Sequence, residues 1–100
     1  MKRTLKAIRC GRILTPHDTI ERGLIITEGS TISAVVQERG FPVPEEAEVL
    51  DLGELTVLPG FIDVHIHGWG GHDFRCPDPQ SLRKVSALLP FQGVTTYLPT

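Results

Sequence analysis

Hydrophobic and polar residues alternate over short stretches of the first 58 or so residues, and turn residues separate these stretches. The pattern predicts strands at about residues 4–9, 23–27, 31–36, 48–52 and 55–58, with a hairpin turn at 28–30. Gly11 is expected to end the first strand, and residues 38–48, rich in Gly, Pro and Glu, are expected to form a solvated loop. Short strands at this spacing predict a small β-sandwich or a partial barrel.

A different pattern begins at Pro59-Gly60. Aliphatic and ionisable side chains alternate strictly over residues 61–67, which predicts a strand with two unlike faces. The aliphatic face carries Ile62, Val64 and Ile66, and the ionisable face carries Asp63, His65 and His67.

A helix is predicted after a glycine-rich loop at residues 68–71. Asp78 is typical of an N-cap, and Pro79 of the first helical position. One helical face would carry Leu82, Val85, Leu88 and Leu89. Pro90 and Gly93 end the helix, and residues 94–98 form another strand, so 60–98 is one βαβ unit of a parallel α/β sheet.

Composition excludes several functional classes. The 100 residues are 40% hydrophobic, with a formal net charge of −2, which excludes disorder and a basic nucleic-acid surface. No apolar run is long enough to cross a membrane, and basic residues interrupt the N-terminal stretch where a signal peptide would be apolar. Two cysteines make no disulfide scaffold, so we expect a cytoplasmic protein.

A single βαβ unit cannot cover both faces and both edges of its own sheet. A (β/α)8 barrel takes about 250 residues. We therefore expect this chain to be the N-terminal part of a larger protein.

His65 and His67 are the first candidates for chemistry. Two residues apart on one strand face, their imidazoles can converge on one metal ion near the strand's end. The alternative is a pair of solvent-facing or hydrogen-bonded histidines, because two ligands do not complete a site that needs at least three.

The stretch Leu58-Pro59-Gly60-Phe61-Ile62-Asp63-Val64-His65-Ile66-His67-Gly68 resembles the first barrel strand of the amidohydrolase superfamily. Residues 68–74 and 93–100 are similar to the N-acetylglucosamine-6-phosphate deacetylase family within it. The resemblance implies that residues 1–58 belong to a small β domain. Residues 59–100 would then begin a metal-dependent (β/α)8 barrel.

The same resemblance implies a reaction, a cofactor and partners. The family hydrolyses N-acetylglucosamine 6-phosphate to glucosamine 6-phosphate and acetate, with one or two divalent metal ions, zinc or iron. His65 and His67 match its first pair of metal ligands. The catalytic Asp and the remaining ligands are expected beyond Thr100. The full-length protein is expected to be a homodimer that binds neither nucleic acid nor membrane, and the 100 residues alone are expected to be inactive.

Other residues are weaker candidates. Asp63 shares the histidine face but lies deeper, which favours hydrogen bonding near the metal over ligation. Gly70, Gly71 and His72 could line the substrate site, although a tight turn and ordinary loop polarity explain them as well. Cys76 is more typical of a plain thiol than of a ligand.

Two alternatives remain open. Other amidohydrolases share this strand motif, among them cyclic-amide hydrolases, N-acyl-amino-acid deacylases and isoaspartyl dipeptidases. A small non-catalytic metal-binding module is the alternative from another class.

Overall fold

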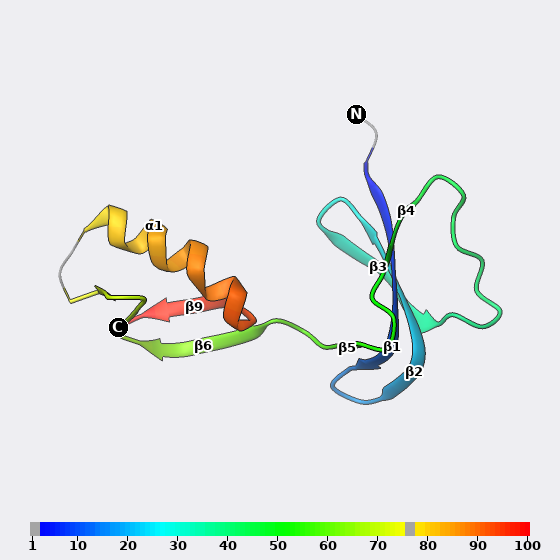
Figure 1. Ribbon diagram of the computed structural model, residues 1–100, viewed down its shortest axis with the longest axis horizontal. Coiled ribbons are helices and arrows are strands. Elements are labelled where there is room, and N and C mark those ends of the chain that lie inside the picture. The colour runs from blue at the N-terminus through cyan, green and yellow to red at the C-terminus, as the bar shows by residue number, and fades with distance from the viewer. Residues whose placement is uncertain (1–2, 76–77) are drawn as a thin grey trace. The chain divides into compact units, whose positions relative to one another are not determined.

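The computed structural model describes residues 3–75 and 78–100 (Figure 1). The chain divides into two compact units, Met1–Pro59 and Gly60–Thr100.

The first unit is built on one five-stranded sheet. Its strands are β1 (Leu5–Leu14), β2 (Thr19–Glu28), β3 (Thr31–Gln37), β4 (Glu48–Asp51) and β5 (Thr56–Val57). The first three strands pair antiparallel in chain order, and β4 and β5 both pair parallel to β1 along its other edge. The predicted hairpin is present within longer strands. Residues 3–59 contribute one sheet only, so one layer of the expected sandwich or partial barrel is seen.

Gly11 does not end the first strand, and that prediction was wrong. β1 continues to Leu14, and the Gly11 amide donates to the Leu55 carbonyl oxygen at 3.0 Å. A Cβ atom at position 11 would lie 2.7 Å from the carbonyl oxygen of Glu54. Glycine is needed here because it lets β1 approach the turn between β4 and β5, not because it breaks the strand.

We expect Gly11→Ala to lower the free energy of unfolding of the first unit by about 1–3 kcal/mol, because the backbone at Glu54 must shift to admit the new methyl group. Denaturant unfolding measures the change. Lys6→Ala, at an exposed position of the same strand, is the control and should stay within about 0.5 kcal/mol of wild type. Equal stability of the two variants would contradict the close approach.

Buried side chains form a cluster on each face of this sheet. One cluster contains Ala7, Leu24 and Ile26, and the other contains Cys10, Ile13 and Ile25. Consecutive residues of β2 therefore serve opposite faces, as period two requires. The segment between β3 and β4 is not simply a solvated loop, because its Val43 and Ala47 pack against the first cluster.

The second unit follows the predicted order of strand, helix and strand. It contains β6 (Phe61–Ile66), β7 (Gly68–Trp69), β8 (His72–Asp73), α1 (Pro79–Leu88), a 3-10 turn (Leu89–Gln92) and β9 (Val94–Pro99). β6 and β9 pair in parallel, and α1 lies along them in Figure 1. The predicted glycine-rich loop is a short hairpin of β7 and β8.

The residues predicted to begin and end α1 have these roles in the structure. The Asp78 carboxylate accepts the Gln80 amide at 2.9 Å, Pro79 opens the helix, and Gly93, with φ of 82°, ends the 3-10 turn. No helix in the described part of the chain is long and apolar enough to span a membrane.

Fewer aliphatic residues are buried in the second unit than the predicted faces of the strand and the helix contain. It contains Ile66, Val85 and Leu89. Leu82 and Leu88 of the predicted helix face are exposed, and Ile62 and Val64 of the strand face are 66% and 65% exposed. The helix packs on the end of β6 near Ile66, so the rest of the aliphatic strand face is uncovered in this unit.

Candidate metal centre

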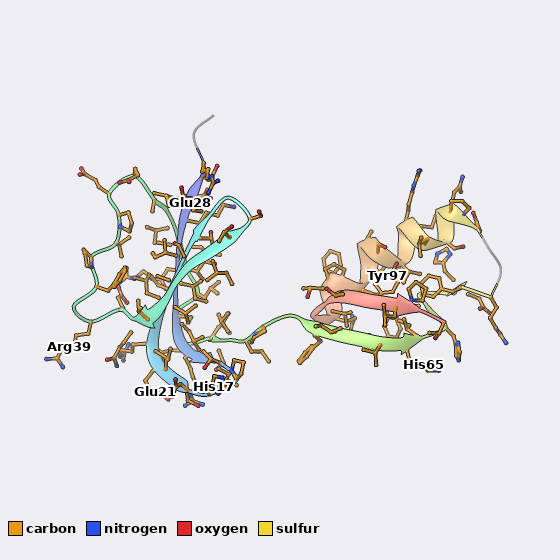
Figure 2. The ribbon with its side chains drawn as sticks, turned by 180° about the vertical axis from the view of Figure 1, so that it is seen from behind. His17, Glu21, Glu28, Arg39, His65 and Tyr97 are labelled. Atoms are coloured by element: carbon orange, nitrogen blue, oxygen red, sulfur yellow. The ribbon has the colours of Figure 1, made fainter. Side chains whose placement is uncertain are left out.

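His65 and His67 meet at the C-terminal end of β6. His65 lies within the strand and His67 directly after it, and both side chains are exposed. Their ring centroids are 4.8 Å apart, with the ring planes at 75°. Figure 2 shows His65 at the end of the strand. The structure thus brings together the two rings that the alternation places on one face.

The ring of His67 has a defined partner. Its Nδ1 lies 2.9 Å from the carbonyl oxygen of Thr100, which follows β9. A carbonyl oxygen only accepts, so Nδ1 carries the hydrogen and donates it. In the neutral ring, Nε2 then holds the free lone pair that a metal ion requires.

Asp63 hydrogen-bonds to backbone at this site. Its Oδ1 accepts the amide of His65 at 3.1 Å, and the residue is partly buried. This contact fixes the backbone just before the histidine ring. A role for Asp63 beside a metal ion stays a prediction.

Gly70 and Gly71 form the tip of the β7–β8 hairpin. They have φ angles of 61° and 85°, and the flanking pair is Trp69 with His72. Two consecutive positive φ angles are typical of a tight type I′ turn, which glycine adopts without strain. The turn accounts for the positive φ at both glycines, and their place in a substrate site stays a prediction. Directly after the hairpin, the Phe74 amide donates to the His67 carbonyl oxygen at 2.7 Å.

His72 connects the hairpin to α1. Its Nδ1 lies 3.4 Å from Oγ of Ser81, whose hydroxyl donates to Oδ2 of Asp78 at 3.3 Å. With its hydrogen given to Asp78, the Ser81 oxygen accepts from His72. The described contact of the His72 ring is thus with Ser81 at the start of α1, and a place for His72 in a substrate site stays a prediction.

Asp73 forms a bidentate ion pair with Arg75. The guanidinium Nη2 donates to Oδ2 at 2.7 Å, and Nε donates to Oδ1 at 3.1 Å. Hydrogen bonds from the Arg75 side chain, and then from its backbone amide, lower the pKa of Asp73 to about 2, with a smaller contribution from the charge of Arg75. Arg75 therefore keeps the Asp73 carboxylate ionised at the end of the β7–β8 hairpin.

The ion pair should be detectable in an acid titration of Asp73. The pKa of Asp73 is lowered in the folded state, so its stabilising contribution is present above the ordinary Asp pKa and is lost as pH falls toward 2. A carbon-detected NMR titration of Asp73 should give a midpoint near 2. Arg75→Gln should raise the midpoint toward 4, and Arg83→Gln, on the exposed face of α1, should not. A midpoint unaffected by Arg75→Gln would contradict the pairing.

The donor set fits a metal but does not complete its coordination. Among residues 3–75 and 78–100, no three His, Cys, Asp or Glu side chains gather closely enough to hold an ion. Cys76 lies outside the described residues. Two imidazoles, one with its Nδ1 already engaged, are the ligands that zinc and iron accept in proteins. A metal centre built on this pair needs at least one further ligand from elsewhere.

Two contacts at this site were missed by sequence reasoning. The carbonyl of Thr100 contacts the ring of His67, and the guanidinium of Arg75 contacts Asp73, yet neither group belongs to a metal or catalytic motif. A usable signal existed for Thr100, because parallel strands bring their C-terminal ends to the same edge. For Arg75 the pairing is local, two residues from Asp73, and local spacing alone does not identify it.

No family model matches the chain. The N-acetylglucosamine-6-phosphate deacetylase of Bacillus subtilis is 34% identical over 88 residues, which cover 88% of this chain and 22% of the relative. The solved structure of the Pasteurella multocida deacetylase matches 95% of this chain with a TM-score of 0.85 at 28% identity. Over most of its own length the chain is therefore similar, in sequence and in fold, to N-acetylglucosamine-6-phosphate deacetylases.

A second solved deacetylase and a relative with another activity also match. A deacetylase from Mycobacterium smegmatis, solved with N-acetyl-D-glucosamine-6-phosphate, matches 96% of this deacetylase-like chain with a TM-score of 0.83 at 29% identity. A dihydroorotase from Geotalea daltonii is 34% identical, but over only 60% of the chain. The chain spans about a quarter of the two solved deacetylases and 22% of the Bacillus relative.

Proposed function

We propose that this chain is the N-terminal part of a metal-dependent deacetylase that hydrolyses N-acetylglucosamine 6-phosphate to glucosamine 6-phosphate and acetate. The observation that carries the proposal is the pair of rings, His65 and His67, 4.8 Å apart at the C-terminal end of a parallel strand. It lies in a chain similar over 88% of its length to a deacetylase of that name. Active sites of (β/α)8 barrels are built at this end of the strands.

In this proposal the two units have separate tasks. Residues 1–58 contribute to a small β domain, and residues 59–100 begin a (β/α)8 barrel with β6 and β9 as its first two strands. Val64 and Ile62, exposed in this unit, would be covered by the rest of the barrel. The homodimer and the cytoplasmic location stay predictions.

His65 and His67 would hold a divalent ion, zinc or iron. When bound, such an ion polarises the amide carbonyl and lowers the pKa of a bound water toward 7. Residues of this chain would orient the two histidine ligands. Thr100 accepts the Nδ1 hydrogen of His67 and leaves Nε2 available, and Asp63 accepts a hydrogen bond from the amide of His65.

A cyclic-amide hydrolase is the second candidate. It is favoured by the similarity to a dihydroorotase, which is 34% identical over 60% of this chain. The deacetylase proposal is better supported because its similarity extends over 88% of the chain rather than 60%.

The test compares substrates on the full-length protein. We expect release of acetate from N-acetylglucosamine 6-phosphate, loss of turnover after chelation, and recovery with zinc or iron. The unphosphorylated sugar and dihydroorotate are the control substrates. Ring opening of dihydroorotate without acetate release would favour the second candidate. The 100 residues alone should show no turnover, because residues 3–75 and 78–100 bring together no three ligands for an ion.

A further inference from the structure

We infer that Thr100 is a positioning residue for His67: it selects the ring tautomer and thereby makes Nε2 the metal-binding nitrogen. The inference deepens the proposed function, because the benefit of that tautomer rests on a metal at this site. The selection itself is a property of the metal-free protein.

Thr100 is held at the strand end by two hydrogen bonds to one oxygen. Its amide and its hydroxyl both donate to the carbonyl oxygen of Ile66, at 2.9 and 3.1 Å. Pro99 pairs with Ile66 in the parallel register of β6 and β9, which brings residue 100 beside residues 66 and 67. These two hydrogen bonds hold residue 100 beside His67, where its carbonyl oxygen lies within reach of the ring.

That carbonyl meets the ring of His67. The oxygen of Thr100 lies 2.9 Å from Nδ1, and this oxygen can only accept. A ring that gives its Nδ1 hydrogen to a fixed acceptor keeps one tautomer and one orientation. Nε2 is then the unprotonated nitrogen before any metal arrives.

The contact between His67 and Thr100 is of the kind that orients metal-binding histidines. Metal-binding histidines commonly donate their second ring hydrogen to a carboxylate or a backbone carbonyl, and removing such a partner typically costs 10- to 100-fold in metal affinity. Here the acceptor is a backbone group, so no side-chain motif marks it. Mutation cannot remove this backbone acceptor, but it can remove the Thr100 hydroxyl that helps to hold the residue in place.

The test uses Thr100→Val and Thr100→Ser in the full-length protein. Valine keeps the shape of threonine and deletes the hydroxyl, whereas serine keeps the hydroxyl. With ¹⁵N-labelled histidine and metal removed, wild type and Thr100→Ser should show His67 protonated at Nδ1. Thr100→Val should show a mixture that includes Nε2-protonated ring. The His67 signals are assigned by their absence in His67→Ala.

Zinc affinity provides the second readout. We expect Thr100→Val to bind zinc about 10-fold more weakly and Thr100→Ser to bind within about 2-fold of wild type. An unchanged His67 tautomer and affinity in Thr100→Val would overturn the inference, as would equal weakening in both variants. If His67→Ala keeps its zinc while Thr100→Val still alters the tautomer, the metal proposal fails and the positioning by Thr100 stands.

Discussion

Replacing His65 or His67 with alanine should strip the full-length protein of most of its metal at this site and lower deacetylation by at least about 100-fold. Each ring would be a direct ligand, and its loss removes a metal–nitrogen bond that no neighbouring side chain among the described residues can replace. Metal analysis of the purified variants and initial rates with N-acetylglucosamine 6-phosphate provide the measurement.

Two other histidines serve as matched controls. His72→Ala removes a ring that contacts Ser81 at the start of α1, and His17→Ala removes a ring from an exposed turn of the first unit. Both variants should keep metal content near wild type. Full metal occupancy in His65→Ala and His67→Ala would contradict the ligand assignment and favour a pair of ordinary hydrogen-bonded histidines.

Gly68→Ala should disrupt the hairpin that follows His67. A Cβ atom at position 68 would lie 1.8 Å from the carbonyl oxygen of His72, and the φ angle there is 157°. The clash is with backbone that is paired across the hairpin, so no side-chain rotation relieves it. We expect a loss of about 3 kcal/mol or more in the stability of the second unit.

Hydrogen exchange at the Phe74 amide measures this loss, because that amide donates to the His67 carbonyl at 2.7 Å. Exchange should be much faster in Gly68→Ala, and metal content should fall with it. Gly71→Ala is the control. Its φ is 85°, but nothing lies within 4 Å of its added Cβ, so only conformational strain of about 1–2 kcal/mol is expected. Equal exchange rates in the two variants would show that the hairpin tolerates the clash.

The elements that depend on local chemistry could be predicted from the sequence. Asp78 and Pro79 begin α1 because a carboxylate cap and a fixed φ act within one turn. Period two places His65 and His67 side by side. These predictions needed no knowledge of distant residues.

Predictions that depend on distant partners were less successful. Gly11 has the usual composition signal of a strand end, but its role is set by Glu54, more than forty residues away. The exposure of Ile62 and Val64 depends on what covers β6, which the alternation of residues does not reveal. The contact between His67 and Thr100 depends on the register of β6 and β9, which includes two irregularities.

The separation of 33 residues between His67 and Thr100 has a consequence for synthesis. At about 5–20 residues per second, the ring leaves the ribosome roughly 2 to 7 s before its acceptor does. The strands β1 to β3, joined by short turns, can pair within microseconds of emerging, whereas the parallel pairing of β6 with β9 must wait for the whole connection through α1. Metal delivered during synthesis would thus meet an unoriented histidine, so loading of the finished site belongs after translation of β9.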